Sequence, residues 1–319
     1  MQTHTNRRLA IVLNVLLVMI LTLMALGAGV RTMNAGLSCP DWPLCFGKVI
    51  PDFHPGVYFE FIHRAYAGLV GLVFFGCCLR IVFSKGLPAS ARIASVFGLV
   101  VLVAQVVMGA LTVLKTIGPL YVTSHLMLAT LFFCSVLWMR FAIRPQVERA
   151  PAQPPWWIYS HSLITSAAVL FQILLGGLVA STYAGMVCVD WPLCNGQWIP
   201  TLKGPIGLQI IHRFFAYGLA VGIPLFAFVA HRNRRASWMT KQLLGLSLAS
   251  AGIVLLQVVI GISNLLLFIP PWLTVIHQSV ALILLAVSLR MYFVARQMAP
   301  VIVPAAESPR AYAVAGVSG

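Results

Sequence analysis

Two stretches of this chain are near copies of each other, and this duplication limits what the chain can fold into. The segment SCPDWPLCFGKVIP (38–51) returns 149 residues later as VCVDWPLCNGQWIP (187–200), with nine of fourteen positions identical and no gap. Because Cys, Trp and Pro are among the identities, chance is a poor explanation. An internal repeat has to be recognised before other features are interpreted. We therefore expect two halves built to the same plan.

Eight apolar runs provide the elements of these halves. They lie near 9–30, 60–83, 93–114, 119–141, 157–181, 207–230, 242–267 and 272–296. A run of about 20 apolar residues is long enough to cross a bilayer as a helix, and the alternating pattern of a membrane barrel is absent. Only 8% of the residues are charged, against about 25% in soluble domains. The sequence predicts an all-α integral membrane protein with eight transmembrane helices.

The distribution of basic residues predicts the orientation. The net charge is +15, and the basic residues lie in short loops between apolar runs. This is the pattern of a topology signal and argues against binding to nucleic acid. Fifteen of the 21 Lys and Arg residues fall on the side of the N-terminus and six on the other side. We expect both termini in the cytoplasm. Arg7 and Arg8 precede the first run without a cleavage motif, so we expect that run to remain as a span.

Each repeat contains four runs, so both halves cross the membrane in the same direction. We predict two tandem four-helix bundles related by a pseudo-two-fold axis along the membrane normal. The predicted boundaries are 1–149 for the first bundle, 150–157 for a Pro-rich linker and 158–297 for the second bundle. Residues 298–319, with low hydrophobicity and several small residues, are predicted to be a disordered tail.

The two long loops, about 32–59 and 182–206, face outward in this topology. Each carries a Cys pair spaced C-x5-C: Cys39 with Cys45, and Cys188 with Cys194. The outer compartment is oxidising in bacteria, so a disulfide is predicted in each loop. A loop this short gains only about 2 kcal/mol from the bond, which leaves both a structural and a redox role open. Zinc is disfavoured because the spacing is not C-x2-C.

Four histidines form a set. His63, His125, His212 and His277 lie near the outward starts of the second, fourth, sixth and eighth runs. The second and fourth helices of a bundle can face each other, and a bundle core is a common place for a cofactor. A small metal ion would need further ligands, whereas a porphyrin supplies four nitrogens itself. We predict a haem-type site with two axial histidines in each half.

The two halves differ at one informative position. Glu60 lies three residues before His63 on the same helical face, and its counterpart is Gln209. A first-turn carboxylate is favoured by the helix dipole, which explains Glu60 but not its replacement. We interpret the difference as a division of labour, with acid–base or radical-stabilising chemistry in the first half. Arg64 and Arg213 either contact haem propionates or extend to the outer interface.

A second motif is also repeated. QVVxG occurs at 105–109 in the third run and at 257–261 in the seventh. Small residues are common where membrane helices contact each other. We interpret QVVxG as a helix-packing motif.

At these residues the sequence resembles the haem A synthase (Cox15/CtaA) family, over roughly residues 8–297. The resemblance is carried by NAGLSCPDWPLC (34–45), EFIHR (60–64), TSHLMLA (123–129), IHRFFAY (211–217) and VIHQSVA (275–281). It implies an oxidoreductase that acts on a CH or CH2 group. The reaction would convert the C8 methyl of haem O to a formyl group, giving haem A for cytochrome oxidase.

The resemblance also implies roles for individual residues. His212 and His277 would be the axial ligands of a resident haem b, while His63 and His125 would hold the substrate haem beside an essential Glu60. Cys39 and Cys45 match the functional Cys pair of the family, and a second pair such as Cys188 and Cys194 occurs in a subset.

The implied setting is the bacterial cytoplasmic (inner) membrane, with the His sites and Cys loops toward the outer side. Haem O and the lipid bilayer are the expected partners. Haem O synthase (protohaem farnesyltransferase), cytochrome oxidase assembly factors and a second copy of the chain are further candidates.

Two other classes are weighed against this function. A quinol-linked b-type cytochrome that transfers electrons would share the paired histidines but would not need Glu60. A transporter or haem exporter with parallel repeats would be expected to have a broken helix at mid-membrane, and the sequence shows none.

Overall fold

The computed structural model describes residues 2–115, 118–148 and 150–298. Eight long helices account for most of them. They are α1 (Gln2–Thr32), α2 (Pro55–Val82), α3 (Ala89–Leu114), α4 (Pro119–Ile143), α5 (Trp156–Ser181), α6 (Gly204–Arg232), α7 (Lys241–Leu266) and α8 (Pro271–Gln297), with a short 3-10 helix, η1 (Ala184–Met186), after α5. All eight are long and apolar enough to cross a membrane. The predicted fold class, an all-α multi-pass membrane protein, is confirmed.

Prolines mark where several helices begin. Pro55, Pro119 and Pro271 stand at the first residue of α2, α4 and α8, and α6 has a proline in its first two positions. Proline suits this position because its missing N–H has no helical partner there in any case. As a result α2 begins five residues earlier than the apolar run indicated. Glu60 therefore lies in the second turn of α2 rather than at its edge.

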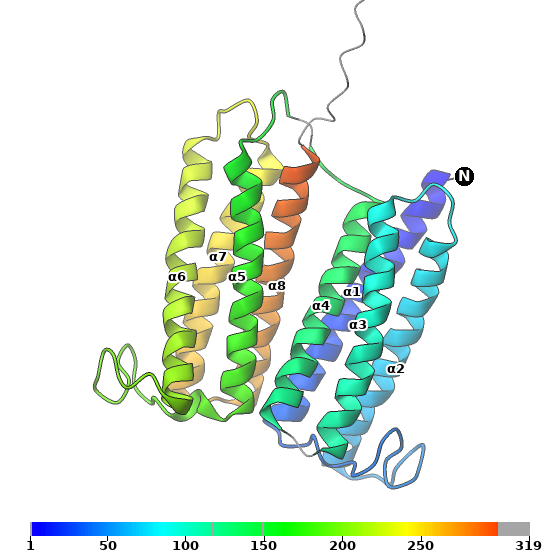
Figure 1. Cartoon of the computed structure of the whole chain (residues 1–319), viewed down its shortest axis with the longest axis vertical. Helices are drawn as coiled ribbons and strands as arrows, with labels where there is room; N and C mark the ends of the chain where they lie inside the picture. The colour runs from blue at the N-terminus through cyan, green and yellow to red at the C-terminus, as the bar shows by residue number, and fades with distance from the viewer. Residues whose placement is uncertain (1, 116–117, 149, 299–319) are drawn as a thin grey trace, which may run out of the picture.

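The helices form two rings of four (Figure 1). In the first ring, α2 and α4 each contact both α1 and α3; in the second, α6 and α8 each contact both α5 and α7. Consequently α2 faces α4 diagonally, and α6 faces α8 in the same way. The pseudo-two-fold relation between the rings and the domain boundaries stay predictions.

The two rings also contact each other. The first contributes α1 and α4 to this interface, and the second contributes α5 and α8. The hydroxyls of Thr123 and Ser181 are 2.9 Å apart across it, and the side-chain amide of Gln278 donates to the carbonyl of Met24 at 3.1 Å. These bonds tie segments beside the candidate histidines of one half to the other half.

The chain ends and the long loops lie at opposite ends of the molecule. The start of α1 and the end of α8 are at one end, whereas the loops 33–54 and 182–203 are at the other (Figure 1). This agrees with the predicted alternation of the spans, while the absolute orientation stays a prediction. The predicted tail, apart from Met298, lies outside the described residues.

Packing differs along the length of the bundles. The largest fully buried side chains include Phe74, Phe133 and Leu285. All of this group lie on the side of the histidines that is away from the long loops. Tight packing of this kind stabilises that end of each bundle. The histidines and the two loops occupy the other end, which is where the candidate site is built.

Candidate functional site

Each of the four predicted histidines faces a glycine on a neighbouring helix. A Cβ added at Gly27 of α1 would lie 2.9 Å from Cε1 of His63 on α2. The corresponding distance is 3.1 Å for Gly109 and His125, 3.2 Å for Gly176 and His212, and 3.0 Å for Gly261 and His277. Contacts this short would push the rings aside. Glycine therefore lets each imidazole lie against the backbone of the next helix.

Glutamines one turn away from these glycines contact three of the rings. The amide nitrogen of Gln105 is 3.2 Å from Nε2 of His125, and that of Gln257 is 3.4 Å from Nε2 of His277. Gln172 lies 3.2 Å from Nδ1 of His212. No hydrogen bond to the ring of His63 is found in the described part of the chain.

Two of these glutamines are also tied to the backbone. The amide of Gln172 donates to the carbonyl of His212 at 3.0 Å, and that of Gln257 to the carbonyl of His277 at 2.9 Å. Sequence reasoning interpreted QVVxG only as packing and missed the related Gln172–Gly176 pair in α5. The signal was available, since Q-x3-G occurs in three of the four helices that precede a histidine helix.

The residues present fit a haem in each half. His63 and His125 lie on the diagonal helices α2 and α4, and His212 and His277 lie on the diagonal helices α6 and α8. Nδ1 of His63, His125 and His277 is buried without a hydrogen-bond partner. Among the described residues, no three His, Cys, Asp or Glu side chains form a group for a metal ion. Two facing imidazoles suit an iron whose other four ligands come from a macrocycle.

Glu60 links α2 to the first long loop. Its side chain is buried, with 3% exposed. One carboxylate oxygen accepts from the backbone N–H of Cys39 at 2.8 Å, and the other lies 2.6 Å from the guanidinium of Arg64. Charge-assisted bonds of this length fix the carboxylate firmly. Glu60 is thus held one turn from His63 and bonded to the backbone of the first cysteine of the loop.

Arg64 and Arg213 play the same part in the two halves. Arg64 donates to the carbonyls of Cys39, Asp41 and Leu44 at 2.7–3.1 Å. Arg213 donates to the equivalent carbonyls of the second loop, those of Cys188, Asp190 and Leu193, at 2.8–3.1 Å. Each guanidinium therefore holds its loop over the end of the bundle. Contact with haem propionates stays a prediction.

The second half lacks the carboxylate network. The amide nitrogen of Gln209 donates to the carbonyl of Gly185 at 3.4 Å, which is a weak contact, and its Oε1 is buried without a partner. Gln209 therefore does not bond Arg213 in the way that Glu60 bonds Arg64. The difference noticed in the sequence corresponds to a difference in contacts.

Both loops are closed by a disulfide. Cys39 is bonded to Cys45, and Cys188 to Cys194, so the predicted pairing is confirmed and any redox role stays a prediction. Both loops contain a cis Trp–Pro peptide bond. In each loop the backbone N–H groups that follow the second Cys donate to an aspartate, Asp41 or Asp190.

These loop aspartates have lowered pKa values. The N–H of Gly47 is the largest cause of the lowered pKa of Asp41, and the N–H of Gly196 has the same effect on Asp190. Hydrogen bonds to the charged form favour it, so both carboxylates stay ionised well into acid.

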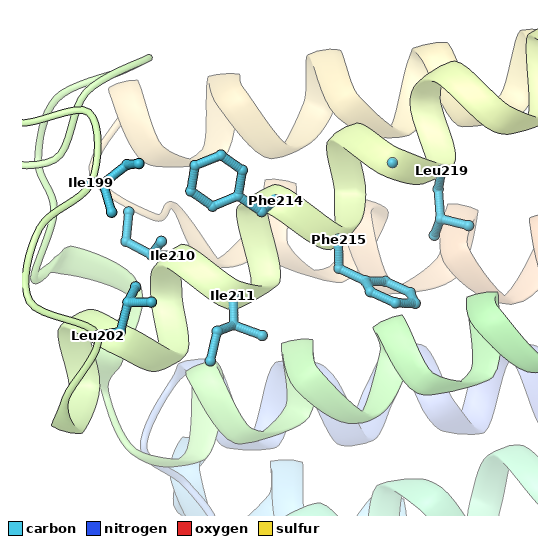
Figure 2. Close-up of a pocket in the computed structure, with 8 residues that line it drawn as sticks. Ile199, Leu202, Ile210, Ile211, Phe214, Phe215 and Leu219 are labelled. Carbon is cyan, nitrogen blue, oxygen red and sulfur yellow. The ribbon is translucent and has the colours of Figure 1, made fainter.

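An apolar groove runs along α6 beside the second site. It has a volume of about 590 Å3, and its lining includes Ile199 and Leu202 from the loop and Ile211, Phe215 and Leu219 from α6. Figure 2 shows Ile211 and Phe215 extending from α6 on the side of α5. The lining offers no titratable side chain, so the groove suits an apolar chain and carries no chemistry of its own.

A family model and several known proteins match this chain over most of its length. The family model described as cytochrome oxidase assembly protein, COX15-CtaA, matches residues 10–55 and 51–289. A protein named heme A synthase from Caulobacter vibrioides is 28% identical, covering 90% of this chain and 96% of its own length. Proteins of the same name from Shewanella oneidensis and Shouchella clausii are 27% and 34% identical, covering 86% and 67% of this chain and 92% and 72% of their own lengths. The chain belongs to the COX15-CtaA family of cytochrome oxidase assembly proteins.

Proposed function

We propose that this membrane protein is an oxidoreductase that converts the C8 methyl of haem O to a formyl group, giving haem A. The observation that carries the proposal is the asymmetry of the two sites. Both halves present two histidines from diagonal helices, but only the first adds a buried carboxylate, Glu60, one turn from His63. Relatives named heme A synthase match the chain over nearly its whole length.

The first half, residues 1–149, binds the substrate. His63 and His125 hold haem O from opposite sides, and its farnesyl tail extends into the bilayer. The facing glycines Gly27 and Gly109 support this role, since they leave the imidazoles close to the helix backbones.

In the second half, residues 158–297, His212 and His277 would hold haem b. The bound haem would supply one-electron transfer. The contacts of the Gln172 and Gln257 amides with the two rings and their backbone carbonyls support a fixed ligand geometry there.

The oxidation proceeds in two stages. The methyl group first becomes a hydroxymethyl group and then a geminal diol, and each stage adds the oxygen of one water and releases two protons and two electrons to an external electron acceptor. The diol then loses water to give the aldehyde. Glu60 moves protons at the carboxylate or stabilises positive charge on the substrate, and a positioned carboxylate of this kind contributes about 10²–10⁴-fold in rate. Arg64 holds that carboxylate in place through the 2.6 Å contact with its guanidinium.

The protein lies in the bacterial inner membrane with both termini in the cytoplasm. The excess of basic residues at the end of the chain termini supports this orientation. The disulfide loops then lie on the oxidising side, where such bonds persist. Haem O synthase is a suitable donor of the substrate, and cytochrome oxidase assembly factors are suitable acceptors of the product.

The first test is to identify the haems that purify with the protein. The chain is expressed together with a haem O source, and extracted haems are separated by chromatography and identified by mass. We expect haem b together with haem O, hydroxymethyl haem or haem A. Haem b alone, with haem O plentiful and no product in the membranes, would refute haem A synthesis and favour an electron-transfer cytochrome.

A further inference from the structure

Three of the four histidines face the glycine of a Q-x3-G pair, whereas His63 faces a glycine that has no such glutamine. Gln105, Gln172 and Gln257 stand four residues before the glycines that face His125, His212 and His277. At the fourth position, in α1, the residue four before Gly27 is Leu23. Leucine has a similar size but no polar group, so the ring of His63 faces a glycine without an adjacent amide.

The three amides share a second property. Oε1 is buried without a partner in Gln105, Gln172 and Gln257. A buried acceptor left unpaired costs about 1–3 kcal/mol, so three such atoms at equivalent places require an explanation. The simplest is that each oxygen has a partner when the site is loaded.

The chemistry of a histidine ligand identifies this partner. A neutral imidazole that binds iron through one nitrogen carries a proton on the other, and that N–H requires an acceptor. The amide nitrogens of Gln172 and Gln257 already donate to the carbonyls of the same histidines. In Gln172 and Gln257 the nitrogen can keep this bond while the oxygen serves the ring. In Gln105 the nitrogen contacts only the ring of His125 among the described residues, so its amide can turn to present the oxygen.

We infer that Gln105, Gln172 and Gln257 are positioning residues, whose amide oxygens accept the free N–H of His125, His212 and His277 when these bind haem iron. His63 faces Gly27, and Leu23 occupies the position that glutamine has in the other three helices, so His63 lacks such an acceptor and is the ligand that leaves the iron most easily. This inference rests on the proposed function, because it assigns the histidines to haem. It places the weakly held ligand next to Glu60, on the side of the substrate where the chemistry is proposed.

The first experiment measures the midpoint potential of haem b in the purified full-length protein. An acceptor on the free N–H makes the imidazole more basic and favours ferric iron. Gln257→Leu should therefore raise the potential, whereas Gln257→Glu, which keeps an acceptor oxygen, should leave it at or below that of the parent. Gln242→Leu is the matched control, since it removes an amide bond to the Gln146 carbonyl at the far end of the same helix, away from the histidines.

The outcomes of this experiment are distinct. An unchanged potential in Gln257→Leu, an equal rise in Gln257→Glu, or a parent protein without haem b would overturn the inference. Formation of haem A is assayed separately in the same preparations. A parent that makes haem A while the potential does not move would refute the glutamine role alone. A potential that moves in a protein unable to make haem A would refute the proposed function alone.

The second experiment tests the weakly held ligand with carbon monoxide. This probe binds reduced haem only where an axial ligand gives way. With haem O loaded, Leu23→Gln should lower carbon monoxide affinity about fivefold, as one added hydrogen bond would. Leu23→Asn, whose shorter side chain ends one carbon earlier, should have little effect. Equal affinity in Leu23→Gln and the parent, with haem b content normal, would overturn the assignment of His63.

Discussion

Replacing Glu60 with Gln would give the first half the residue that the second half already has at position 209. The carboxylate forms two strong bonds, 2.6 Å to Arg64 and 2.8 Å to the N–H of Cys39. Removing its charge weakens a charge-assisted bond worth about 1.5–3 kcal/mol. Arg64 retains three loop carbonyls, and Arg213 holds the second loop with the equivalent three alone. We therefore expect the variant to fold.

The effect on turnover should be much larger than the effect on stability. Loss of a carboxylate that handles protons at the reacting group lowers the rate by about 10²–10⁴-fold, which corresponds to about 3–5 kcal/mol in the barrier. Haem A should fall by at least about 100-fold, while haem O accumulates and haem b remains bound. The assay is chromatography of haems extracted from membranes that also contain a haem O source.

A matched substitution separates this effect from a general one. Glu148 lies at the opposite end of the bundles, where it accepts a bond from the backbone of Gln242, and Glu148→Gln should leave haem A output unchanged. The protein is treated with a mild reductant and then with an alkylating agent. The extent to which Cys39 and Cys45 are alkylated reports whether the loop is still held. Haem A output in Glu60→Gln within tenfold of the parent would refute the catalytic role of the carboxylate.

Three further predictions concern packing and the loops. Gly261→Ala should displace the ring of His277 and lower haem b retention, whereas Gly252→Ala on the same helix, where a Cβ meets nothing within 4 Å, should not; the haem-to-protein ratio after purification decides. Removing either loop disulfide by Cys→Ser should cost the loop about 2 kcal/mol, seen as faster proteolysis within that loop, and unchanged proteolysis would contradict this. The lowered pKa of Asp41, caused mainly by the N–H of Gly47, means that its contribution is complete above about pH 4 and is lost as the pH falls through the lowered value. Proteolysis of the first loop should therefore rise in acid for the parent, and Asp41→Asn should show the faster rate at every pH.

The sequence alone was sufficient for the membrane fold. Eight apolar runs and the duplicated loop predicted eight helices in two sets of four, because a backbone in lipid must satisfy its hydrogen bonds within each helix. The same pattern placed four histidines near one end of the spans. Helix starts were less well predicted, since Pro55 and Gly56 do not count as apolar residues although proline suits the first turn of a helix.

The internal duplication also revealed the difference between Glu60 and Gln209, because equivalent positions of the two halves can be compared within one chain. The disulfide pairing followed from the short C-x5-C spacing and the compartment. These features are local in the sequence, and a local pattern is enough to predict them.

Only the tertiary structure decided which residues surround each histidine. Gln172 is 40 residues from His212, and Gln105 is 20 residues from His125, so their contacts depend on which helices are neighbours and how each helix is rotated. A glycine that admits an imidazole has the same sequence signature as one that admits another helix, which is why QVVxG was interpreted as packing. Likewise, the sequence could not show that Arg64 and Arg213 hold loop carbonyls. Every residue has a backbone carbonyl, so the sequence does not mark which ones accept from a guanidinium. Only the folded loop brings those carbonyls together.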